Sequence, residues 1–146
     1  MAREILEDFE IYLKSEGYSN IYLNYQPFDP DSPSKNRGGV YIFNDPSEPI
    51  QAFSQEVDEV IQFVIRGIDK SDTITKAKTM MYLFNSFRGY LNTDSEAVFY
   101  YIIGIAVQPR VFGNTGQNNI IEYEFRLNVK YLDKSLNTIQ TSKVLT

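Results

Sequence analysis

The residues of this chain that come closest to catalytic chemistry are two carboxylates. Glu122 and Glu124 lie two residues apart in a strictly alternating segment, so both point to one face of a predicted strand. Paired carboxylates at comparable separation hydrolyse glycosidic bonds in other proteins. Arg126 occupies the next position on the same face, and a solvated strand face explains all three residues more simply. A small carboxylate-dependent hydrolase therefore stays open as an alternative hypothesis.

Two further pairs of acids could hold a hard cation through oxygen atoms. Asp29 and Asp31 lie in a proline-containing stretch that lacks the spaced acids and terminal glutamate of a calcium loop, and side-chain turns explain them more simply. Asp69 and Asp72 form the second pair, and the segment 71–74 (SDTI) is better placed to begin a helix. The sequence therefore predicts no metal and no cofactor.

Other catalytic chemistry has little support. The 146 residues include no histidine and no cysteine, which removes the commonest general base, the thiolate nucleophile and the commonest transition-metal ligands. Ser54, Ser71 and Ser86 therefore lack a histidine partner. The glycines of segment 112–116 (FGNTG) are not followed by the Lys-Ser or Lys-Thr pair of a phosphate-binding loop. We therefore expect a protein that is not an enzyme.

Composition favours a protein that assembles with other proteins. The net charge of −5 argues against a broad face for nucleic acid, which needs clustered basic residues. Eleven tyrosines and ten phenylalanines suit subunit interfaces, although a tyrosine-rich core explains them equally well. The acid-containing segment 1–8 is not a signal peptide, and no apolar run approaches the roughly 20 residues of a membrane helix. We expect the protein to remain in the cytoplasm of the cell that makes it.

The elements that must position these residues follow from hydrophobic periodicity. The pattern predicts an α+β fold, with a mainly antiparallel sheet of four to five strands and two helices packed on one face. Residues 1–135 would form this single domain, and 136–146 a flexible C-terminal tail. Segments 26–39 and 110–119 are expected to be loops, and 47–54 irregular. The predicted elements are a helix to about Gly17, strands 20–25, 40–43 and 57–66, a helix from Ser71 to about Leu91, and strands 98–108 and 121–131.

The middle of the chain resembles the tail-terminator, or minor capsid, proteins that join head and tail in long-tailed phages with non-contractile tails. The residues that carry the resemblance are the run 60–67 (VIQFVIRG), the following helix with Tyr82, Leu83 and Phe87, and the segments 105–110 (IAVQPR) and 123–129 (YEFRLNV) on either side of a Gly/Asn loop. It covers about residues 1–135. The chain departs from the pattern most in segment 26–39 and after Asp133.

This resemblance implies a structural virion protein at the tail–head junction, assembled in the host cytoplasm. Subunits would form a hexameric ring that caps the tail-tube protein and meets the head-connector protein, while DNA passes through the centre without specific binding. Arg110, Phe112 and Asn114 would contact the tube or a neighbour, and Arg126 and Lys130 would pair with acids of the next subunit. A connector-side stopper or a relative of the tail tube remains an alternative.

Overall fold

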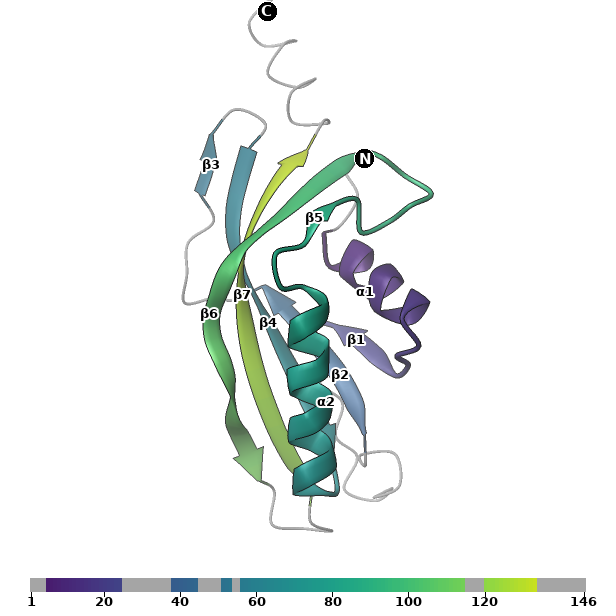
Figure 1. Cartoon of the computed structure of the whole chain (residues 1–146), viewed down its shortest axis with the longest axis vertical. Helices are drawn as coiled ribbons and strands as arrows, with labels where there is room; N and C mark the ends of the chain where they lie inside the picture. The colour runs from purple at the N-terminus through teal and green to yellow at the C-terminus, as the bar shows by residue number, and fades with distance from the viewer. Residues whose placement is uncertain (1–4, 25–37, 45–50, 54–55, 115–119, 134–146) are drawn as a thin grey trace, which may run out of the picture.

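The computed structural model describes residues 5–24, 38–44, 51–53, 56–114 and 120–133, and these form an α+β fold (Figure 1). Two helices accompany a mostly antiparallel, seven-stranded sheet whose strands lie in the order β1-β2-β4-β7-β6-β5, while β3 also pairs with β4. The helices are α1 (Ile5–Ser15) and α2 (Lys70–Leu83). The strands are β1 (Ile21–Leu23), β2 (Gly39–Asn44), β3 (Gln51–Phe53), β4 (Glu56–Gly67), β5 (Arg88–Gly89), β6 (Val98–Asn114) and β7 (Ile121–Asp133).

The seven strands exceed the four to five expected from the sequence. The two unexpected strands, β3 and β5, have three and two residues, which is too short for an alternating pattern to show. β3 lies in the segment expected to be irregular. Within this mainly antiparallel sheet, β1 runs parallel to β2. The long connection between these strands allows the parallel arrangement, which a tight hairpin turn cannot.

The second helix is shorter than its apolar pattern suggested. Its N-cap is Asp69 rather than the Ser71 segment, and the Asp69 side chain accepts a hydrogen bond from the backbone N–H of Asp72 at 2.8 Å. The helix ends at Leu83, because Phe84 caps it and Ser86 adopts the left-handed φ of 60°. The apolar residues after that point continue into β5 and the following turn, not into the helix.

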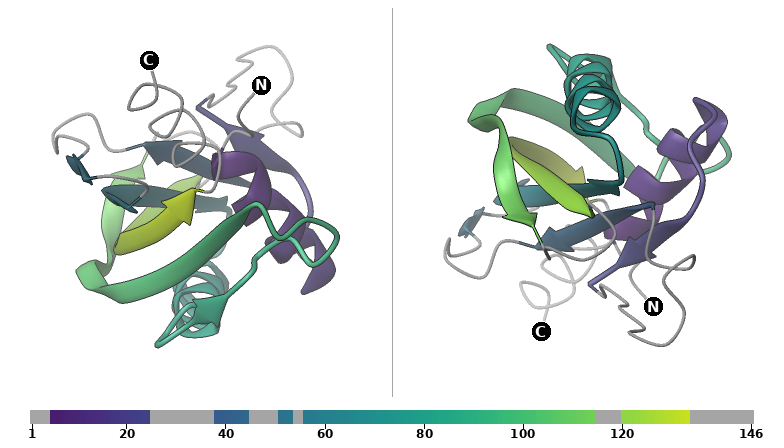
Figure 2. Two further views of the ribbon diagram at one scale, coloured as in Figure 1. Left: turned by 90° about the horizontal axis from the view of Figure 1, so that it is seen from above. Right: turned by 90° about the horizontal axis from the view of Figure 1, so that it is seen from below.

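Strand β6 is longer than expected and does not stop at Pro109. It continues to Asn114, so the predicted loop at 110–119 begins as strand, and residues 115–119 lie outside the described part. Pairing with β7 shifts register four times along its length, including once across Pro109. Bulges of this kind admit a proline and bend a strand. Figure 2 shows the resulting strong curvature of β6 around the end of the sheet.

Both helices contribute to a single hydrophobic core. Phe9 of α1 lies at its centre, with its ring centroid 5.5 to 5.7 Å from those of Phe63, Phe84 and Tyr100. The Tyr100 hydroxyl donates a 2.6 Å hydrogen bond to the buried Asp8 carboxylate, which fixes α1 against β6. No described helix is long and apolar enough to cross a membrane. The odd-numbered residues of the two central strands complete the core: Val57, Ile61, Phe63 and Ile65 of β4, and Tyr123, Phe125, Leu127, Val129 and Tyr131 of β7.

Candidate protein–protein interface

The even-numbered residues of β4 and β7 form the opposite side of the sheet, here called the outer face. The antiparallel register places Arg66 opposite Glu122, Gln62 opposite Arg126, and Asp58 opposite Lys130. The two ends of this face differ in character. The end at Arg66 is buried and ionic, whereas the end at Lys130 is open and partly apolar.

The buried end is held by carboxylate–arginine contacts that close over both candidate catalytic acids. Arg66 donates to Glu122 at 3.0 Å, and the Arg66 guanidinium lies 4.7 Å from the centroid of the Tyr41 ring. Glu124 accepts hydrogen bonds from Gln62 at 3.0 Å, Arg126 at 2.8 Å and Arg110 at 3.1 Å. The expectation that Glu122 and Glu124 lie on a solvated face is therefore wrong, because only 8% and 3% of their surfaces are exposed.

The hydrogen bonds determine the charge of Glu124. Burial by itself raises the pKa of this carboxyl group, but hydrogen bonds from Arg126, Gln62 and Arg110, together with the Arg126 charge, outweigh burial and leave the pKa below its ordinary value. A general acid needs the opposite shift, towards neutral pH. The arrangement therefore suits Glu124 as a fixed anion that links β4, β6 and β7.

The basic residues predicted to contact partners make ion pairs within the chain. The Arg110 side chain is 58% exposed and reaches back from β6 to Glu124. Arg126 also binds Glu124, and its side chain is 22% exposed. Lys130 lies 3.7 Å from Glu56 and 3.9 Å from Asp58. Contact of Arg110, Arg126 and Lys130 with a neighbouring subunit stays a prediction, and it would require them to share or exchange these partners.

The remaining predicted residues fall in different places. Phe112 and Asn114 belong to the backbone of β6, but their side chains lie outside the described part of the structure. Asp29 and Asp31 also lie outside it. Asp69 and Asp72 are exposed at the start of α2, where the Asp69 side chain caps the helix by accepting from the backbone N–H of Asp72. Within the described ranges, no group of three or more acids, histidines or cysteines could hold a metal ion.

The free edge of β6 is a feature that the sequence did not indicate. β5 and the preceding Phe87 cover this edge as far as Ile102, so the described sheet offers no strand to residues 103–114 on that side. Ile103 and Val111 of this segment are 51% and 54% exposed. Unpaired backbone groups beside exposed apolar side chains are the usual template for adding a strand from another chain. Alternation alone could not predict this, because it does not say which part of a strand is left without a neighbouring strand.

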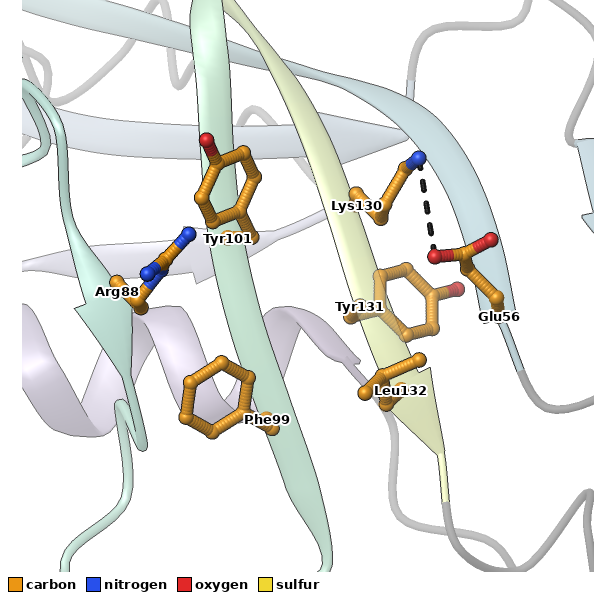
Figure 3. A pocket seen from close by; sticks show the side chains of 7 residues that line it. All are labelled: Glu56, Arg88, Phe99, Tyr101, Lys130, Tyr131 and Leu132. Atoms are coloured by element: carbon orange, nitrogen blue, oxygen red, sulfur yellow. Dashed lines mark ion pairs between the residues drawn. The ribbon is translucent and has the colours of Figure 1, made fainter.

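A pocket of about 400 Å³ opens on the outer face next to this edge (Figure 3). It crosses β4, β5, β6 and β7 where Arg88, Tyr101, Lys130 and Asp58 follow one another in register. The Arg88 guanidinium lies 4.7 Å from the centroid of the Tyr101 ring. A smaller pocket at the β6 edge shares Arg88 and Tyr101. The lining residues are Glu56, Arg88, Phe99, Tyr101, Lys130, Tyr131 and Leu132.

Comparisons with known proteins assign no family. No protein-family model matches the chain, and no curated protein sequence matches it significantly.

Proposed function

We propose that this protein is a structural virion protein of the tail-terminator kind, which forms a ring on the phage tail tube and joins it to the head connector. The free edge of β6 is the observation that supports this proposal most directly. A closed ring needs a contact between two different surfaces of neighbouring subunits. An edge strand on one subunit provides one of these surfaces, and it can pair with an extended segment of the next.

The edge also carries features that limit indiscriminate pairing. Pro109 lacks a backbone N–H, and the register shifts along β6 interrupt the regular spacing of its hydrogen-bonding groups. Natural proteins use prolines and bulges on edge strands to prevent aggregation. A segment that binds here must match the spacing of this particular strand. This requirement suits a subunit that stays soluble until it meets its proper neighbour.

We further propose that both helices cover the core face of the sheet and leave the outer face for contacts with partners. The support is that Leu6 and Phe9 of α1 and Met80 of α2 share one core cluster with the odd-numbered residues of β4 and β7. By alternation, the outer face then carries the pocket and the basic residues Arg126 and Lys130. The helices would stabilise each subunit, while the outer face and the β6 edge form the assembly surface.

The test uses purified protein and tail tubes assembled without a terminator. We expect electron microscopy to show the protein as a ring at one end of each tube, and the decorated tubes to stop growing when more tube protein is added. A protein that leaves the tube ends bare and tube growth unchanged contradicts the proposal. Binding to purified connector without any binding to tubes would favour the stopper alternative instead.

A further inference from the structure

The pocket on the outer face combines an apolar floor with a cation that forms no ion pair with the carboxylates of the described residues. Phe99 and Leu132 are opposite each other in the register of β6 and β7, and Tyr101 lies two residues further along β6. Leu132 and Tyr101 are 36% and 37% exposed, although they are large apolar or aromatic residues. Such a surface gains free energy when another apolar side chain covers it.

The two cations beside Tyr101 differ in their partners. Lys130 has two carboxylates within 4 Å, Glu56 and Asp58. Arg88 forms no ion pair with any carboxylate of the described residues, and its guanidinium stacks on the Tyr101 ring. Stacking of this kind holds the guanidinium plane while its N–H donors remain available for a carboxylate. The pocket is therefore complementary to an anionic group next to an apolar one.

We infer that this pocket binds an extended acidic segment of a partner protein, with an apolar side chain and a carboxylate two residues apart. The carboxylate would bind Arg88 at the level of Tyr101, and the apolar side chain would lie over Phe99 and Leu132. Residues two apart on a strand point to the same side about 7 Å from each other, and Phe99 and Tyr101 have this same spacing on β6. The inference deepens the proposed function and rests on it. The smaller pocket at the β6 edge shares Arg88 and Tyr101, so a segment bound here would lie next to the edge proposed to contact a partner.

The probe is a capped, threonine-rich hexapeptide that contains the sequence Phe-Thr-Asp. Its controls are the same peptide with asparagine in place of aspartate, and an isomer in which phenylalanine and aspartate are adjacent and so face opposite sides. Binding to the full chain is followed by NMR through the resonances of Arg88, Gly89 and Tyr101. We expect the asparagine peptide and the isomer to bind roughly three- to tenfold more weakly than the probe.

Charge reversal gives the decisive comparison. Arg88→Glu should abolish the preference for the aspartate peptide and create a preference for a peptide with lysine at that position. Lys78→Glu, at an exposed position of α2, changes the net charge equally and should leave the original preference intact. A thermal unfolding curve for each variant confirms that it is folded.

Equal affinity for the aspartate and asparagine peptides would overturn the inference, as would the absence of Arg88 shifts at about 10 mM peptide. These outcomes are separate from a failure of the proposed function. If tube ends are decorated but the peptides do not discriminate, the inference alone is wrong. If the peptides discriminate but the tubes stay bare, the pocket has the chemistry inferred here and serves a different assembly.

Discussion

Glu124 is the residue at which three strands of the sheet converge. Its carboxylate accepts hydrogen bonds from side chains of β4, β6 and β7, although it is almost fully buried. A buried carboxylate that loses its charge leaves several donors without a strong acceptor. Its contribution to folding should therefore exceed that of any exposed acid, and it should depend on pH.

We expect Glu124→Gln to lower the free energy of unfolding by about 2–3 kcal/mol at neutral pH. Since the pKa of Glu124 is lowered in the folded state, its contribution is complete above the unfolded pKa and is lost as the pH falls through the folded pKa. Urea unfolding at about pH 7 and about pH 3 measures the loss of stability and its dependence on pH. The difference between wild type and variant should shrink at the lower pH. The exposed Glu96→Gln serves as control, and an equal loss in both variants would contradict the prediction.

The sequence predicted the direction of these side chains but not their environment. Strict alternation in 121–131 correctly separated Glu122, Glu124 and Arg126 from the core residues between them. It could not show that Arg66 and Arg110, far away in the sequence, would cover the two acids. Pairing between distant strands decides burial on a sheet face, and a local pattern carries no information about that pairing.

At the scale of elements, the junction between β4 and α2 depends on the close approach of Gly67 to Thr73. Gly67 ends β4, and a methyl group added there would collide with the Thr73 hydroxyl of the first helical turn. Thr73 cannot easily give way, because it is buried and its hydroxyl donates to the Asp69 carbonyl at 2.6 Å. The absence of a side chain at position 67 therefore lets the helix start with only two residues between it and the strand.

Gly67→Ala should cost about 1–3 kcal/mol of stability through this overlap. Gly104→Ala provides the matched comparison, because nothing lies within 4 Å of its added methyl group. The same substitution at this strand position should change stability by less than about 0.5 kcal/mol or raise it slightly. Thermal or urea unfolding measures both variants. Equal effects at the two positions would mean that backbone entropy, and not contact with Thr73, decides the outcome.

Most elements were predictable from periodicity, whereas the strands β3 and β5 and the end of α2 were not. α1, β4 and β7 have enough residues for a helical or alternating period to be clear, and Gly17 with its φ of 96° ends α1 as expected. The end of α2 was missed, because apolar residues such as Phe87 and Leu91 continue a helical spacing although the chain has already turned at Ser86. Capping and turn geometry override periodicity at such points.

For the whole molecule, the distribution of exposed apolar residues favours one surface for the proposed assembly. Ile103 and Val111 are exposed residues of the part of β6 that no described strand covers on its outer side, and Tyr101 and Leu132 line the neighbouring pocket. Tyr82 is 64% exposed but belongs to helix α2, which offers no strand edge of its own. Exposure alone therefore does not distinguish the two regions, whereas exposure on a strand segment without a described neighbouring strand does.

We expect the double variant Ile103→Lys with Val111→Lys to lose assembly while keeping its fold. Both side chains are about half exposed, so each change should alter stability by no more than about 0.5–1 kcal/mol. Lysines on an edge strand oppose pairing, because a neighbouring strand would have to bury or displace their charges. Sedimentation velocity and electron microscopy of tube ends measure assembly, and urea unfolding measures the fold. Tyr82→Lys is the control and should assemble as the wild type does. A double variant that still forms rings would mean that subunits meet through another surface, and the free edge of β6 would then have no part in the ring.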